Sequence, residues 1–119
     1  MIGVADAFSA RYAQARVKFL EAAATASLAI ESHNHPLTGR DGEVLAMDVA
    51  RSGPPDAQRL LIVSSACHGV EGYCGSGVQV YALHDAEWLA KARDAGVAVL
   101  YIHALNPFGF SHVRRVTHE

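Results

Sequence analysis

Two apolar runs constrain the fold of this 119-residue chain more than any other feature. They occupy residues 59–66 (RLLIVSSA) and 97–105 (VAVLYIHAL), and a continuous apolar centre is typical of a strand buried on both faces of a sheet. Between them, residues 78–83 and 86–95 have helical composition, and Gly96 is the predicted C-cap. A strand, a crossover helix and a second strand at this spacing predict a right-handed βαβ unit.

The first half of the chain predicts a helix and a hairpin. Residues 5–26 contain no internal Gly or Pro, and apolar residues recur at helical spacing: Phe8, Tyr12, Ala15, Phe19 and Ala22. Residues 28–33 and 44–49 are short strand candidates joined by a turn-rich segment. We therefore predict an α/β fold with a mixed sheet, built from an N-terminal helix, a β-hairpin and one right-handed βαβ unit.

Composition argues against nucleic-acid-binding, membrane-spanning and disulfide-rich proteins. Half of the residues are hydrophobic and 18% are charged, which predicts one globular domain. The net charge of −2 argues against nucleic acid as a partner, and no apolar run approaches the ~20 residues that span a membrane. The two cysteines, Cys67 and Cys74, form no disulfide framework, and the N-terminus lacks the pattern of a signal peptide. These features predict a cytoplasmic protein.

Candidate chemistry lies after the two predicted parallel strands, where α/β sheets bind their ligands. His68 and Glu71 stand three residues apart in a Gly-rich segment directly after the first of these strands. An imidazole nitrogen and a carboxylate oxygen are both ligands of Zn²⁺ in catalytic sites. As a spacing alone, this pair favours a loop histidine bonded to a neighbouring carboxylate over a metal site.

The motif set resembles that of a known enzyme superfamily. His68-Gly-Val-Glu-Gly72, then Gly75-Ser-Gly77 with Gln79, then Asn106-Pro-Phe-Gly-Phe110 with Arg114-Arg115, is similar to the zinc carboxypeptidase superfamily (carboxypeptidase A-like metallopeptidases), most closely to an uncharacterised bacterial branch. The superfamily also includes the succinylglutamate desuccinylase and aspartoacylase group. The resemblance therefore implies zinc-dependent hydrolysis of an amide bond next to a carboxylate, in a small molecule or peptide with a free carboxylate.

The resemblance implies a role only for those residues of this chain that match the family's motif. The resemblance implies that His68 and Glu71 are the first two zinc ligands. It also implies that Arg115, or in its place Arg114, polarises the scissile carbonyl as the catalytic arginine and contacts the substrate. A guanidinium aimed at a developing oxyanion stabilises its charge while zinc polarises the same carbonyl. For one of the two arginines, an exposed surface position is the expected alternative.

The sequence also departs from the family pattern. Relatives continue with an Asn-Arg pair that grips the substrate carboxylate, a third ligand histidine and, much later, a glutamate base, whereas this chain ends at Thr117-His118-Glu119. The resemblance covers about residues 20–119, so we predict that residues 1–119 form a single partial domain, the N-terminal portion of a zinc carboxypeptidase-like (phosphorylase/hydrolase-like) catalytic domain. We assign no role to His118. On this hypothesis the full-length parent is a hydrolase and the 119-residue chain is inactive alone.

Two other interpretations stay open. One is a non-enzymatic α/β module whose Gly-rich loop binds an anion at a helix N-terminus. The other is a decayed remnant without activity. Two parallel strands and a hairpin also leave an open sheet edge that further strands would normally cover, and a fragment that folds alone is expected to self-associate through it.

Overall fold

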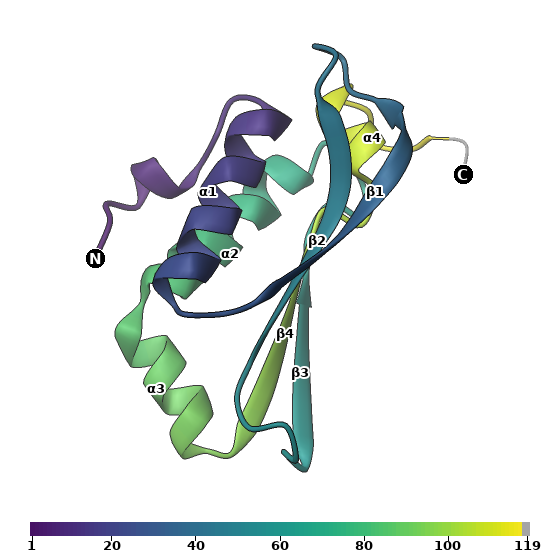
Figure 1. Cartoon of the computed structure of the whole chain (residues 1–119). Helices are drawn as coiled ribbons and strands as arrows, with labels where there is room; N and C mark the ends of the chain where they lie inside the picture. Colours follow the sequence, from purple (N-terminus) through teal and green to yellow (C-terminus); the bar gives the residue numbers. More distant parts are fainter. Residues whose placement is uncertain (118–119) are drawn as a thin grey trace.

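The protein is described by a computed structural model, in which residues 1–117 are placed (Figure 1). The helices pack against one mixed sheet. In chain order the helices and strands are η1 (Ala5–Ala7), α1 (Tyr12–Thr25), β1 (Ile30–Thr38), β2 (Val44–Ser52), β3 (Arg59–Ser64), α2 (Gly72–His84), α3 (Ala86–Asp94), β4 (Val97–His103) and α4 (Pro107–Ser111). Among these residues no helix is long and apolar enough to cross a membrane.

The sheet has four strands in the order β1-β2-β4-β3. The predicted hairpin is confirmed, since β1 and β2 are antiparallel neighbours. The strands of the βαβ unit are also confirmed, because β3 and β4 pair in parallel with Leu61 opposite Val99. β2 joins the two halves by pairing antiparallel with β4, with Asp48 opposite His103. The fold is therefore α/β with a mixed sheet, as predicted.

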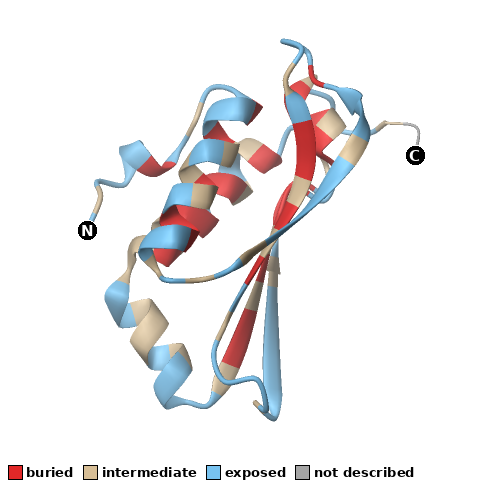
Figure 2. Cartoon of the chain, viewed as in Figure 1, coloured by how far each residue is buried: buried red, intermediate tan, exposed pale blue. Residues whose placement is uncertain are grey.

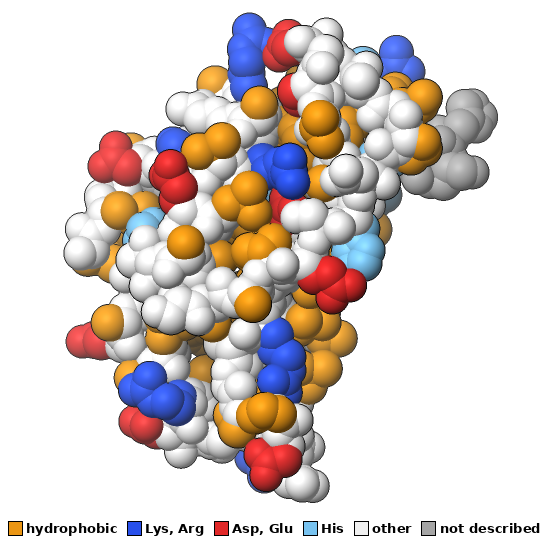
Figure 3. Space-filling view, viewed as in Figure 1, with side chains coloured by type: hydrophobic (Ala, Val, Ile, Leu, Met, Phe, Trp, Pro, Cys, Tyr) orange, Lys and Arg blue, Asp and Glu red, His pale blue; other side chains and the backbone are white. Residues whose placement is uncertain are grey.

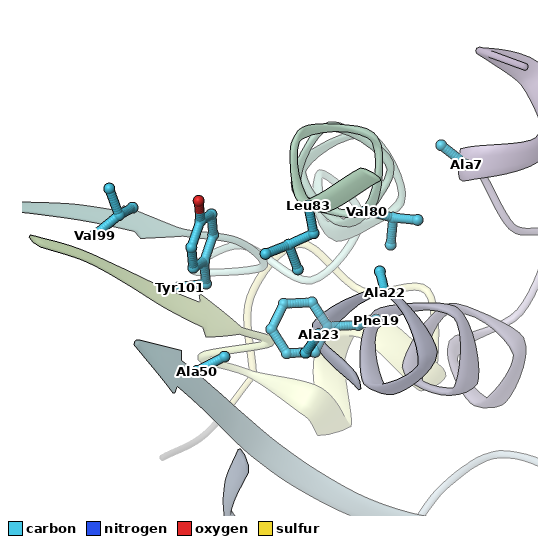
Figure 4. Close-up of a cluster of buried hydrophobic side chains, with 9 residues drawn as sticks. All are labelled: Ala7, Phe19, Ala22, Ala23, Ala50, Val80, Leu83, Val99 and Tyr101. Atoms are coloured by element: carbon cyan, nitrogen blue, oxygen red, sulfur yellow. The ribbon is translucent and has the colours of Figure 1, made fainter. Parts of the chain in front are cut away.

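The main core lies between the sheet and the helices on one of its sides. α1, α2 and α3 lie on that side in Figure 1, and in Figure 2 buried residues gather where α1 and α2 face the sheet. Small residues let α1 and α2 approach each other and the strands closely. The core cluster drawn in Figure 4 consists of Ala7, Phe19, Ala22, Ala23, Ala50, Val80, Leu83, Val99 and Tyr101.

The N-terminal helix is shorter than predicted. α1 begins at Tyr12, and residues Ala5–Ala7 form only a 3₁₀ turn. Phe8 leaves the helical stripe because its ring lies against Gly77 of α2, where a Cβ atom would come within 2.1 Å of it. Lys18 Nζ donates to the Phe8 carbonyl oxygen at 2.6 Å, which holds this segment extended across the helices. Tertiary packing here overrides helix propensity.

The Gly-rich segment is more helical than predicted. α2 begins at Gly72 rather than near Val78. A Cβ atom at Gly72 would lie 2.5 Å from the Phe110 ring, and one at Gly75 would lie 2.9 Å from Ser65. These glycines therefore permit close packing of the helix against its neighbours. The C-cap of α3 is Ala95, one residue before the predicted Gly96, which follows it in the left-handed region with φ +71°.

β3 differs from its predicted burial. The apolar run predicts a strand buried on both faces, yet β3 is the edge strand, and Figure 2 shows it exposed along its length. Leu60, Leu61 and Ile62 are 54%, 42% and 56% exposed. The pattern identified the strand correctly, but burial also requires a neighbour on each side, and residues 1–117 place none beyond β3.

Buried polar side chains are bonded to one another beneath α1. Asp48 on β2 is fully buried, and its carboxylate accepts from Arg16 Nε at 2.8 Å and from Ser32 Oγ at 2.6 Å. His103, also fully buried, stacks on Phe19 and shares a 2.8 Å hydrogen bond between its Nε2 and Ser76 Oγ. Each bond offsets the cost of removing a polar group from water.

Candidate functional site

The candidate site is formed by the two segments that follow β3 and β4. Because these strands are parallel neighbours, their carboxyl ends lie at the same edge of the sheet. The segments continue side by side: the Leu105 N–H donates to the Ser65 carbonyl oxygen at 2.9 Å, and the Asn106 N–H donates to that of Ala66 at 2.8 Å. Ala66 and Ala104 adopt left-handed backbone conformations, with φ of 58° and 70°. Each alanine follows its strand within two residues, and non-glycine residues in this strained conformation cluster at functional sites.

Asn106 organises the second segment. Its side-chain Oδ1 accepts from the Gly109 N–H at 2.9 Å and caps α4, with Pro107 at the first helical position. Its Nδ2 donates to Thr117 Oγ1 at 2.9 Å. Asn106 thus holds the chain on both sides of the two arginines.

Gly69 joins the two segments. Its N–H donates to the Arg115 carbonyl oxygen at 3.2 Å, and the residue is buried. A Cβ atom at this position would lie 2.1 Å from the Gly109 carbonyl carbon and 2.4 Å from the Arg114 oxygen, so only glycine fits without movement of backbone. The contact brings the His68–Glu71 loop beside the arginine segment.

The side chains at this joint are exposed and loosely paired. Arg115 Nε lies 3.8 Å from Glu71 Oε2, and these side chains are 66% and 55% exposed. His68 is half-buried, and Arg114 is exposed. The structure thus brings Glu71 and Arg115 together, and the arginine beside the carboxylate is Arg115 rather than Arg114. It does not test the roles that the resemblance implies.

His68 and Glu71 suit a zinc ion by chemistry, since both supply ligand types that zinc accepts. Within residues 1–117, however, no three His, Cys, Asp or Glu side chains lie close enough together to hold a metal ion. His118 lies outside the described residues. The part of the chain that the structure describes therefore holds no complete set of the three protein ligands that a catalytic zinc site uses.

The start of α2 gives no support to the anion-binding alternative. The N–H groups of Gly72 and Tyr73 donate to the carbonyl oxygens of Gly69 and Val70, and those of Cys74 and Gly75 both donate to that of Glu71. These are the groups that an anion at a helix N-terminus would use. Each of them is already bonded to backbone.

Sequence reasoning missed Gly69 and Asn106 as the residues that position the site. A signal existed for Asn106, because an asparagine directly before a proline is typical of an N-cap followed by the first residue of a helix. For Gly69 no local signal existed, because its requirement comes from Gly109 and Arg114, some forty residues later.

Several solved structures are similar to this chain in part. Porphyromonas gingivalis glutaminyl cyclase aligns with a TM-score of 0.49 and 16% identity, over 77% of this chain and 38% of that one. Macrostomum lignano glutaminyl cyclase aligns with a TM-score of 0.47 and 13% identity, over 81% and 32%. The esterase LipW from Mycobacterium marinum gives 0.39 and 18%, over 83% and 31%. The chain spans less than half the length of these structures.

Sequence comparison identifies the family of the chain. No curated protein matches it. Residues 8–119 match a protein family along nearly the whole chain. The chain therefore belongs to the family described as "Protein of unknown function (DUF2817)".

Proposed function

We propose that this chain carries the first part of the active site of a zinc-dependent hydrolase that cleaves an amide bond next to a carboxylate. One observation carries the proposal: the segments after β3 and β4 meet at Gly69, and their meeting sets Glu71 beside Arg115 with His68 in the same loop. The resemblance to zinc carboxypeptidases supplies the roles of these three residues.

In this proposal His68 and Glu71 hold the metal through an imidazole nitrogen and a carboxylate oxygen. Bound zinc would polarise the scissile carbonyl and lower the pKa of a water molecule. Arg115 directs its guanidinium to the carbonyl oxygen and stabilises the negative charge that develops there. Arg114 contacts the substrate. Glu71 can exchange its arginine partner for a metal at small cost, because their 3.8 Å pair is exposed on both sides.

The proposal also limits what this chain does alone. A site with two protein ligands lacks the third that catalytic zinc sites use, so we expect weak zinc binding. Without a general base, we expect little or no hydrolysis by the 119-residue chain. The activity belongs to the parent enzyme in which the remaining ligand and base are present.

The first test is zinc binding, measured by competition with a chromophoric chelator. We expect weak binding that His68→Ala abolishes and that His33→Ala leaves unchanged. His33 is a sharp control because its Nε2 lies 3.1 Å from Glu31 Oε1, which makes another exposed imidazole and carboxylate pair on the same chain. Equal binding by both variants, or a loss only in His33→Ala, would show that zinc does not use His68.

The second test compares the 119-residue chain with a version extended through its downstream reading frame. We expect about one zinc per extended chain, lost on His68→Ala, together with hydrolysis of an acyl-amino acid. Metal-dependent hydrolysis by the 119-residue chain itself would contradict the two-ligand interpretation. Absence of zinc from both would leave His68 and Glu71 as an ordinary loop pair.

A further inference from the structure

The hairpin of β1 and β2 reaches past the edge of the sheet that carries the candidate site. Because β2 runs antiparallel to β4, it begins at the edge where β4 ends. Its pairing with β4 stops where Asp48 lies opposite His103, so residues 44–47 and the turn before them project beyond β4. α4 packs against this projecting part of the hairpin. The hairpin therefore supports the helix from which the chain continues to Arg114 and Arg115.

The projecting part of the hairpin is fixed to α1. The buried Tyr12 takes the place of a neighbouring strand there: its hydroxyl donates to the Ala46 carbonyl oxygen at 2.8 Å and accepts from the Ala46 N–H at 2.9 Å. At the turn, Arg11 Nη1 lies 3.3 Å from Asp41 Oδ2. Figure 3 shows basic and acidic side chains together at the end of the molecule where Figure 1 places this turn. With its backbone bonded to a buried side chain, the hairpin can act as a firm support.

Glu43 shapes the turn itself. Its carbonyl oxygen accepts from the Gly39 N–H at 2.8 Å, and its Oε1 accepts from the Asp41 N–H at 3.2 Å. The carboxylate folds back over Gly39, where any Cβ atom would collide with it. The second oxygen of the carboxylate, Oε2, bonds to a residue outside the hairpin.

That residue is Ser111, the last residue of α4. Its hydroxyl donates to Glu43 Oε2 at 3.0 Å and accepts from the Arg40 N–H at 2.8 Å. The bond to a carboxylate is of the stronger, charge-assisted kind. Ser111 is 4% exposed, so both bonds are shielded from water. One buried hydroxyl thus joins the end of α4 to the hairpin turn.

The chain between Ser111 and the arginines is short and tightly bonded. The Arg114 N–H turns back to α4 and donates to the Gly109 carbonyl oxygen at 2.8 Å. The Arg115 carbonyl oxygen accepts from the Gly69 N–H at 3.2 Å. A displacement of Ser111 would therefore be passed on to Arg115 and to its contact with Gly69.

We propose that Ser111 is a positioning residue for Arg115, with Glu43 as its anchor in the hairpin. The contact holds α4, and with it the arginine segment, at a fixed place beside the loop of His68 and Glu71. This role rests on the proposed function, since Arg115 is the side chain that stabilises charge on the scissile carbonyl. Ser111 acts through Arg115 and touches no reacting atom.

Amide exchange of the 119-residue chain tests the contact without metal or substrate. Ser111→Ala should speed exchange of the Gly69 amide on the order of tenfold, because its acceptor, the Arg115 carbonyl oxygen, is held less firmly. Glu43→Ala should have the same effect, and the double variant should add nothing, since all three lack the same bond. The amides of β4 should keep their rates in each variant, which checks that the fold is retained.

Ser32→Ala is the matched control. The Ser32 hydroxyl also donates to a carboxylate within the hairpin, that of Asp48 at 2.6 Å, but in the part of the hairpin that β4 covers. The Gly69 amide should exchange in this variant as in the unchanged chain. Unchanged Gly69 exchange in Ser111→Ala, or equal acceleration in Ser32→Ala, would overturn the proposal.

Kinetics of the chain extended through its downstream reading frame test what the contact does for the reaction. Ser111→Ala should lower kcat for an acyl-amino acid on the order of tenfold to a hundredfold with KM unchanged, because Arg115 acts on charge that develops in the transition state. An unchanged kcat would overturn the positioning role. Absence of zinc and of hydrolysis from the extended chain without substitutions would instead reject the proposed function, and the exchange of the Gly69 amide would still decide whether Ser111 holds the arginine segment.

Discussion

The buried polar cluster under α1 and the candidate site at the strand ends use similar residue types in opposite ways. In the cluster, Arg16 and Asp48 meet at 2.8 Å with the carboxylate fully buried. At the site, Arg115 and Glu71 meet at 3.8 Å with both side chains more than half exposed. The first arrangement fixes α1 onto β2. The second leaves the Glu71 and Arg115 side chains accessible to a ligand from solvent.

The buried core also holds side chains of the types found in catalytic sites, but a substrate cannot reach them. Ser76, His103 and Asp48 are the residue types of a hydrolytic triad, and Ser76 Oγ is bonded to His103 Nε2 at 2.8 Å. All three are buried, with exposures of 2%, 0% and 0%. Phe19 stacks on the imidazole of His103, and the Phe110 ring lies tilted beside it. A set of side chains that no substrate reaches belongs to the core.

Removing the buried carboxylate should produce the largest effect. Asp48→Ala leaves the Arg16 guanidinium and the Ser32 hydroxyl without their shared acceptor, and breaking a buried ion pair costs about 3 to 5 kcal/mol. Urea denaturation of the variant and the unchanged chain measures this loss. The matched control is Asp41→Ala, whose 3.3 Å pair with Arg11 is half exposed and should change the free energy of unfolding by less than about 1 kcal/mol. Similar losses in both would remove the distinction between the two kinds of pair.

Acid should destabilise the buried core around His103. Burial lowers the pKa of His103 to about 4, although the nearby Asp48 carboxylate raises it in part. In the unfolded chain this histidine titrates near 6.5, so the unfolded state gains a proton first as the pH falls. Stability should therefore be full above pH 6.5 and decline by about 1.4 kcal/mol per pH unit toward pH 4.

Urea denaturation between pH 7 and pH 5 checks this slope, and an NMR titration of the His103 ring checks its source. We expect the His103 signals to stay at their neutral positions at pH 5.5. Stability that does not change over this range, or a His103 ring that is already protonated at pH 5.5, would contradict the expected burial of a neutral imidazole.

The joint between the two segments should show a smaller loss of stability together with a loss of site geometry. Gly69→Ala places a Cβ atom against the Gly109 and Arg114 backbone, and overpacking of this kind costs about 1 to 3 kcal/mol. The loop must move to relieve it, so zinc binding through His68 should also fall. Gly3→Ala is the control, because its Cβ would meet only the flexible Asp6 side chain. Full retention of stability in Gly69→Ala would show that the two segments are not held together at this point.

The sequence predicted the parts of this molecule that depend on local pattern. The hairpin, the parallel strands and the carboxyl-end placement of His68 and Glu71 followed from apolar runs and turn residues. The sequence did not predict features that depend on contacts between residues far apart in the chain. The Phe8 ring packs against Gly77 instead of continuing the helical stripe. α2 begins at Gly72, where the absence of a side chain lets the Phe110 ring lie close to the helix. The exposure of β3 could not be predicted, because an apolar run does not say how many strands surround it.

The side chains of the candidate site should contribute least to the free energy of unfolding. Arg115→Ala removes a long, exposed ion pair, and such pairs contribute about 0 to 1 kcal/mol. The backbone contact to Gly69 survives the change because it uses the Arg115 carbonyl oxygen. Urea denaturation should therefore give the same midpoint as the unchanged chain, within about 0.5 kcal/mol. A loss as large as that of Asp48→Ala would mean that Arg115 is held in the fold like Arg16, and a side chain needed for stability at that point would no longer be available to a substrate.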